Sequence, residues 1–211
     1  MAALFDFDGV VVDTEPQYTI FWDEQGRKYL SKEDFGRSIK GQTLGQIFGG
    51  HFAGMDEIQQ QIVSDLNEYE KHMKFDYMPG VVEFMKSLRA NGIKLAIVTS
   101  SNDLKMANVY REHPELKTLV DRILTSDSFT RSKPDPECFL MGAKVFDTTV
   151  DNCVVFEDSF HGLEAARRAG MKIVGLCTTN SRDAIQDKAD VVIDDFTAFT
   201  VQHFESLLDT K

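Results

Sequence analysis

Cysteine is scarce in this chain. The three cysteines, Cys138, Cys153 and Cys177, lack the spacing of metal ligands, and two of them lie in apolar segments typical of strands. We therefore expect buried, reduced thiols and a cytoplasmic location, where disulfides are rare. Long apolar runs are missing too: no segment approaches the roughly 20 residues of a membrane span, and no signal peptide precedes the first predicted strand. We expect no membrane partner.

Positive charge is the second deficit. The 211 residues include 23 Lys and Arg against 34 Asp and Glu, a formal net charge of -11. This balance disfavours nucleic acid and anionic membrane surfaces as partners. An anionic small-molecule substrate would need a metal ion and a local lysine to offset the field. The other proportions, 42% hydrophobic and 27% charged, are those of an ordinary globular protein, and we expect a monomer or weak dimer.

Strand and helix patterns alternate along most of the chain. Short apolar runs predict strands at 2–5, 93–98, 121–125, 153–156, 172–176 and 191–193. Apolar residues at helical spacing predict helices near 81–92, 102–112, 135–146, 159–170, 181–187 and 199–208. This alternation, with continuous apolar strands, is typical of a parallel sheet covered on both faces. The sequence therefore predicts an α/β fold with a Rossmann-like sheet.

The segment after the first strand departs from this alternation. From about residue 15 to 76 we find no convincing strand, and helical spacing recurs near 16–28, 32–38, 43–51 and 55–73. Glycines, Gly41 among them, interrupt these helices. We predict that residues 14–78 form a small α-helical domain, inserted into an α/β core made of residues 1–13 and 79–211.

Two aspartates stand directly behind the first predicted strand. Because side chains alternate along a strand, Asp6 and Asp8 should point to the same side at its carboxyl end, where open α/β sheets bind their ligands. Two carboxylates this close repel unless a cation or a shared proton relieves them. The pair indicates a divalent metal site in which one carboxylate can act as a nucleophile. The alternative is a simple turn at Gly9.

Polar residues also follow other predicted strands. Thr99 and Ser100 come after the second strand, where a hydroxyl and free backbone N–H groups ahead of a helix suit phosphate oxygens. Glu157 and Asp158 come after the fourth strand and could complete an oxygen shell for Mg²⁺. For both pairs the alternative is helix capping, which favours the same residue types.

A lysine precedes the fourth predicted strand in a stiff segment. Lys133 stands before Pro134-Asp135-Pro136, so its ammonium would be held in a fixed place; the alternative is a solvated surface group. Carboxylate, hydroxyl, ammonium and again carboxylate groups thus occur in order on a fold that gathers its strand ends. Together they indicate metal-dependent phosphoryl transfer.

Four segments carry a resemblance to a known family. DFDGVVVDTEP, IVTSSN, SKPDPECF and VVFEDSFHGLEAARRAG resemble the motifs of the haloacid dehalogenase superfamily. The similarity is to the phosphatase and β-phosphoglucomutase-like branch, in which a helical cap follows the first motif, and it covers essentially the whole chain. It implies that residues 14–78 are such a cap. Dehalogenation is not implied, because dehalogenases of this superfamily lack the aspartate present here as Asp8.

The resemblance also implies a role for each motif residue. Asp6 would attack phosphorus to form an aspartyl-phosphate, and Asp8 would protonate the leaving oxygen and then activate water or a sugar hydroxyl. Acid action by Asp8 leads us to expect that burial under the cap raises its pKa. Thr99, with the backbone at Ser100, would hold the phosphoryl group, and Lys133 would neutralise charge. The implied Mg²⁺ ligands are three carboxylates and one main-chain carbonyl: Asp6, Glu157, Asp158 and the carbonyl of Asp8.

The cap is the part that reads the leaving group in this family, with Thr14 at the expected hinge. β-Phosphoglucomutases carry an arginine shortly after a Lys-Gly pair in the cap; here Lys40 and Gly41 are present, but Leu44 stands where that arginine is expected. Tyr18 replaces a histidine usual in the first cap helix. These departures favour hydrolysis of a small phosphomonoester, a sugar or polyol phosphate. The alternative is a β-phosphoglucomutase-type transfer to a second sugar hydroxyl.

Overall fold

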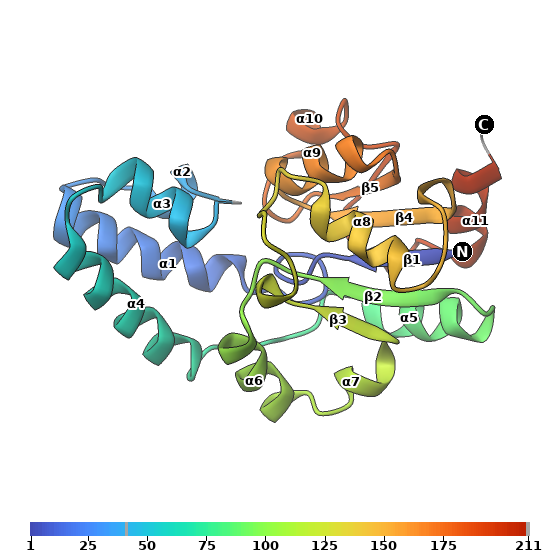
Figure 1. The fold of residues 1–211 in the computed structure, drawn as a ribbon, viewed down its shortest axis with the longest axis horizontal. Helices are drawn as coiled ribbons and strands as arrows, with labels where there is room; N and C mark the ends of the chain where they lie inside the picture. Colours follow the sequence, from blue (N-terminus) through green and yellow to red (C-terminus); the bar gives the residue numbers. More distant parts are fainter. Residues whose placement is uncertain (41, 210–211) are drawn as a thin grey trace.

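One parallel sheet of six strands organises the chain (Figure 1). The structure, a computed structural model, describes residues 1–40 and 42–209, so Gly41 lies outside the described residues. The strands lie in the order β3-β2-β1-β4-β5-β6. Their bounds are β1 Ala2–Phe5, β2 Lys94–Val98, β3 Arg122–Leu124, β4 Cys153–Glu157, β5 Lys172–Leu176 and β6 Val191–Ile193. The predicted α/β fold is confirmed.

Helices cover both faces of this sheet. On one face, α5 (Val81–Ala90), α6 (Asp103–Glu112) and α11 (Val201–Asp209) share a buried cluster with the strands. On the other face, α8 (Glu137–Lys144) and α9 (Phe160–Ala169) do the same. The short helices α7 (Leu116–Leu119) and α10 (Arg182–Ile185) add buried residues to the first and the second of these clusters, respectively, and α7 is absent from the predicted elements. Within the described part of the chain, no helix is long and apolar enough to span a membrane.

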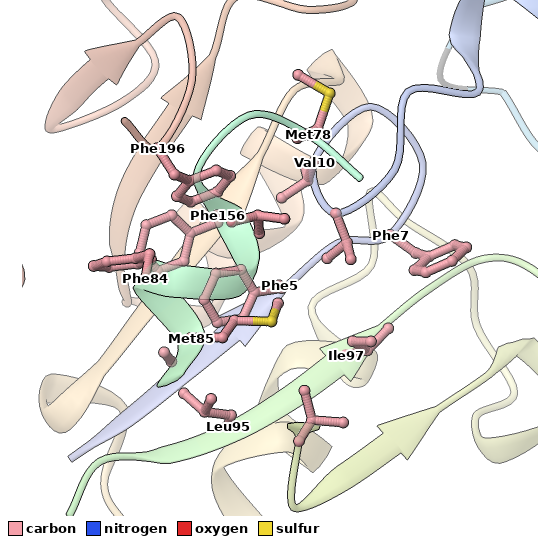
Figure 2. Packing of buried hydrophobic residues seen from close by; sticks show 14 of the residues in the cluster. Phe5, Phe7, Val10, Met78, Phe84, Met85, Leu95, Ile97, Phe156 and Phe196 are labelled. Atoms are coloured by element: carbon pink, nitrogen blue, oxygen red, sulfur yellow. The ribbon is translucent and has the colours of Figure 1, made fainter. Parts of the chain in front are cut away.

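The strands are apolar on both sides because both faces are covered. In β1, Ala3 and Phe5 pack in one cluster and Leu4 in the other, as the two-residue period of a strand requires. Phe5 stacks on Phe156 of β4 with their ring centroids 4.5 Å apart, and Phe84 of α5 packs edge-on against both (Figure 2). Such aromatic pairs add about 1 kcal/mol beyond the burial of their area. These aromatic contacts help to hold β1 and β4 in register with each other, directly before the segments that follow the two strands.

A separate helical region lies to one side of the sheet (Figure 1). Its elements are α1 (Glu15–Gln25), which continues as a π-helical turn (Gly26–Leu30), α2 (Phe35–Ser38), α3 (Leu44–His51) and α4 (Asp56–Glu70). This region has its own buried cluster, which includes Phe21, Trp22, Phe35, Phe52 and Ile62. Its described residues contain no strand, as predicted. The protein therefore has a helical cap region after the first strand.

Two connecting segments join this region to the sheet side by side. The backbone N–H of Asp13 donates to the carbonyl of Asp76 (2.9 Å), and that of Met78 donates to Val11 (2.9 Å). Val12 and Tyr77 form an antiparallel bridge between them. A single insertion whose two ends meet is what the sequence predicts. The boundaries 14 and 78 stay a prediction.

Candidate active site

The strand order places the first two carboxylates of the site side by side. β1 lies between β2 and β4, which is where the order of strands reverses and where open α/β sheets bind ligands. Phe5 is in register with Phe156, so the next residues, Asp6 and Glu157, emerge together at the carboxyl edge. The N–H of Asp6 donates to the carbonyl of Phe156 (2.9 Å), which fixes the backbone beyond the strand.

Lys133 joins these two carboxylates. Its Nζ lies 2.7 Å from Oδ1 of Asp6 and 2.6 Å from Oε1 of Glu157. The lysine is 4% exposed and Glu157 is fully buried, so little water screens the pairs. The two carboxylates raise the pKa of Lys133 although burial alone would lower it. The ammonium predicted to be held in place is fixed inside the protein rather than solvated.

Three carboxylates form a cluster with more negative charge than one ammonium can balance. Oxygen atoms of Asp6, Glu157 and Asp158 lie within 4.8 Å of one another. Burial, countered by Lys133 but reinforced by Glu157, raises the pKa of Asp6 to about 7. Burial and the neighbouring Glu157 carboxylate also raise the pKa of Asp158 well above its usual range. An all-oxygen donor set of this kind fits a hard divalent cation, and a bound cation would relieve the repulsion.

Two glycines allow the backbone to approach this cluster. Gly9 has a φ of 74°, and a Cβ there would lie 2.1 Å from Oδ2 of Asp158. A Cβ on Gly162 in α9 would lie 1.7 Å from Oε1 of Glu157. Neither position accepts a side chain without displacing an acidic residue. The space around the carboxylates therefore depends on both glycines.

Residues after β5 hold Asp158, and the sequence reasoning missed them. The hydroxyl of Thr179 donates to Oδ2 of Asp158 in a short contact, and Nδ2 of Asn180 donates to its backbone carbonyl (2.9 Å). The hydroxyl of Thr178 donates to the carbonyl of Gly9 (2.6 Å). The sequence did carry a signal for these residues, because they too are polar residues shortly after a predicted strand.

The segment after β2 presents its hydroxyls to the same space. Thr99 is 1% exposed, and its Oγ1 accepts a hydrogen bond from the N–H of Ser101 (3.0 Å), which leaves its own proton free for an acceptor. Ser100 is exposed and lines the cavity described below. The side chain of Asn102 caps α6 by accepting from the N–H of Lys105 (2.9 Å). Capping and a ligand-facing hydroxyl thus coexist in this segment.

Asp8 is held differently from Asp6. Its Oδ1 accepts from the hydroxyl of Thr14 (2.5 Å), its Oδ2 accepts from the hydroxyl of Ser101 (2.9 Å), and Nζ of Lys105 lies 2.6 Å from both oxygens. Burial alone would raise the pKa of Asp8, but the Lys105 ammonium and the two hydroxyls lower it below its usual range. The expectation of a raised pKa is therefore wrong for this arrangement, because it left out a buried cation.

Lys105 is the main residue that sequence reasoning missed. It lies in the first turn of α6 and is 4% exposed. A lysine in this position faces the positive end of the helix dipole, which favours acidic residues there. A basic residue at the end of a helix that favours acidic ones was therefore the signal in the sequence that Lys105 has a partner elsewhere. The partner of Lys105 lies 97 positions earlier in the chain, so the contact itself could not be read from the sequence.

A cavity of about 530 Å³ connects these groups with the helical cap region. The predicted residues that line it are Asp6, Asp8, Lys40, Thr99, Ser100, Lys133, Glu157 and Asp158. Thr14 reaches it through Asp8. On the cap side, Tyr18 and Leu44 line the cavity, and Nζ of Lys40 pairs with Glu15 at 3.1 Å. The predicted site residues therefore meet around one cavity between sheet and cap.

Comparisons with known proteins agree with the fold. Residues 3–176 match the family model of haloacid dehalogenase-like hydrolases. The chain belongs to this family, and is thus a hydrolase of α/β fold with a helical cap.

Two curated proteins and one solved structure are similar to this chain over most of its length. Validoxylamine A 7'-phosphate phosphatase of Streptomyces hygroscopicus subsp. limoneus is 29% identical over 95% of this chain and 96% of its own. The phosphorylated carbohydrates phosphatase of Thermotoga maritima is 29% identical over 81% of this chain and 82% of its own. A haloacid dehalogenase-type hydrolase of family IA, variant 3, from Entamoeba histolytica has a solved structure with a TM-score of 0.86, at 22% identity over 99% of both chains.

Proposed function

We propose that this protein is a Mg²⁺-dependent phosphatase that hydrolyses a small phosphomonoester, a sugar or polyol phosphate, through an aspartyl-phosphate on Asp6. The observation that carries the proposal is the buried contact of Asp6 with Lys133 beside the acidic pair Glu157 and Asp158. Two relatives, one named as a phosphatase of validoxylamine A 7'-phosphate and the other as a phosphatase of phosphorylated carbohydrates, support the substrate class.

The first half-reaction transfers the phosphoryl group to the protein. A carboxylate oxygen of Asp6 attacks phosphorus, and the bond between phosphorus and the leaving oxygen breaks. Asp8 supplies the proton for that oxygen. Lys133 offsets charge on Asp6 and the phosphoryl group, while Thr99 donates its hydroxyl proton to a phosphoryl oxygen. Mg²⁺, held by Asp6, Glu157, Asp158 and the carbonyl of Asp8, would screen the repulsion between nucleophile and substrate.

The second half-reaction returns Asp6 to its free form. Water attacks phosphorus, Asp8 accepts the proton of that water, and inorganic phosphate leaves. The low pKa of Asp8 means that it starts ionised without substrate. A phosphoryl dianion beside it disfavours the ionised form, so substrate binding helps Asp8 to take up the proton that the first half-reaction needs.

The cap side of the cavity favours a substrate with one phosphate. Among the described residues that line the cavity, each lysine already faces a carboxylate: Lys40 faces Glu15, Lys105 faces Asp8, and Lys133 faces Asp6. Leu44 contributes only apolar surface where a mutase would place an arginine. A second phosphate would therefore meet no unpaired cation from this set. Water is thus a more suitable acceptor than a second phosphorylated sugar.

A screen of phosphorylated metabolites with Mg²⁺ tests the proposal by phosphate release. We expect release from one or a few sugar or polyol phosphates, and none from the Asp6→Asn variant. The mutase alternative predicts instead that β-glucose 1-phosphate, with a bisphosphate primer, yields glucose 6-phosphate. Activity of Asp6→Asn equal to the parent protein would reject the proposed nucleophile.

A further inference from the structure

The Asp8 carboxylate is held by three side chains from two segments: Thr14 lies six residues after it, whereas Ser101 and Lys105 lie 93 and 97 residues after it. Oδ1 accepts from Thr14 and Lys105, and Oδ2 accepts from Ser101 and Lys105. Because each oxygen has two donors, the carboxylate has one preferred plane and direction. Of these donors, Lys105 alone contacts both oxygens, so it alone fixes the tilt of the whole group.

The cap region in turn contacts Lys105. Its Nζ lies 4.6 Å from the centroid of the Tyr18 ring in α1, a cation–π distance. The hydroxyl of Tyr18 donates to Oε1 of Glu70 at the end of α4 (2.8 Å). A continuous series of contacts therefore runs from two cap helices, through Lys105, to Asp8.

Stability alone gives little reason for a lysine at this position. The ammonium is removed from water and faces the positive end of the α6 dipole. Buried ion pairs are often no more stabilising than apolar side chains of the same volume. The rings of Phe7 and Tyr18 lie near Nζ and would accept an apolar side chain, but such a side chain would leave the Asp8 carboxylate without the cation that now lies 2.6 Å away. What an apolar residue could not provide is the two-oxygen contact with Asp8.

We propose that Lys105 is a positioning residue, which aims the Asp8 carboxylate into the cavity and makes that aim depend on Tyr18 in the cap. The inference rests on the proposed function, since it acts through the acid and base role of Asp8. Its consequence is specific: removal of Lys105 impairs proton transfer to the leaving oxygen more than it impairs attack by Asp6.

Leaving groups of different basicity separate these two effects. An alkoxide needs a proton to leave, whereas 4-nitrophenolate leaves with little help. The value of kcat/KM reports the steps up to phosphoryl transfer, so it avoids the shared hydrolysis of the aspartyl-phosphate. For Lys105→Met we expect kcat/KM to fall on the order of 100-fold for a sugar phosphate and less than about 10-fold for 4-nitrophenyl phosphate.

Lys117→Met is the matched control. Lys117 is exposed, and its Nζ also lies over a tyrosine ring, that of Tyr110 at 4.1 Å, but it does not line the cavity. We expect wild-type kcat/KM for both substrates. As a rescue, ethylammonium added to Lys105→Ala should restore the sugar-phosphate reaction in a concentration-dependent way, because it can occupy the place of the lost ammonium.

The possible results of these measurements distinguish a failure of the positioning role from a failure of the proposed function. Equal losses for both substrates, or no rescue by ethylammonium, would overturn the positioning role and leave a structural one. If Lys105→Met does not fold, Tyr18→Leu provides the second test: the positioning role predicts a several-fold loss confined to the sugar phosphate, and unchanged ratios would contradict it. Absence of phosphate release by the wild-type protein would instead reject the proposed function itself.

Discussion

Without metal, the protein should lose stability as the pH rises toward neutrality, because of Asp6. Burial raises the pKa of this carboxyl from 3.8 to about 7 in the folded state. Between these two values the folded protein keeps a proton that the unfolded chain has released, so the free energy of unfolding falls as the pH rises. One proton over one pH unit is worth about 1.4 kcal/mol. Half of that proton is released from the folded state at pH 7, so from pH 5 to pH 7 Asp6 alone should remove about 2 kcal/mol.

Comparison with Asp6→Asn isolates this effect. Asparagine has nearly the shape of a neutral aspartate but cannot titrate. Burial and Glu157, the larger causes of the raised pKa of Asp158, act in both proteins, whereas the smaller effect of the Asp6 charge is absent from the variant. Urea unfolding in the presence of a chelator, at intervals from pH 5 to pH 8, gives the free energy of unfolding of each. We expect the variant to gain about 3 kcal/mol over the parent protein across this range. Parallel curves for the two proteins would refute the reasoning, since they would mean that Asp6 ionises as freely in the fold as outside it.

Three further predictions concern the same cluster. Mg²⁺ at 100 times the Kd for pH 8 should add about 2.7 kcal/mol of stability at that pH. The same Mg²⁺ concentration should raise the melting temperature less at pH 5, because protons compete with the ion; equal rises would contradict a carboxylate site. Lys133→Met should lower the free energy of unfolding by about 3–5 kcal/mol at neutral pH and abolish phosphate release, whereas a stable, active variant would exclude its role. Gly162→Ala should displace Glu157 and so abolish Mg²⁺ binding measured by calorimetry. The control is Gly49→Ala, whose Cβ would meet nothing within 4 Å and which should stabilise the protein by up to about 1 kcal/mol. Intact Mg²⁺ binding in Gly162→Ala would show that the cluster tolerates the shift.

Much of the fold followed from local pattern. The six strands lie within a residue or two of their predicted positions because each is a short apolar run bounded by polar or glycine residues. Asp6, Thr99 and Glu157 could be placed in one site because parallel strands end at the same edge of a sheet. The four-residue helix α7 (Leu116–Leu119) was missed, since it is too short to show a helical period.

What sequence reasoning missed is long-range packing. The pKa of Asp8 depends on Lys105, and whether a lysine of α6 reaches the loop after β1 is decided by how the helix sits on the sheet. Likewise, the contact between Tyr18 and Glu70 requires α1 and α4 to lie together in the cap. In each case the residue type was visible and its partner was not.

Identification of the phosphorylated residue tests the central claim most directly. The Asp8→Asn variant, incubated with Mg²⁺ and a reactive phosphate ester such as 4-nitrophenyl phosphate, should accumulate the acyl-phosphate, because it lacks the base that activates water. Reduction with borohydride converts a phosphorylated aspartate to homoserine, which peptide mass spectrometry locates in the sequence. We predict homoserine at position 6. Homoserine at another position, or turnover with no modified residue at all, would contradict a nucleophilic Asp6.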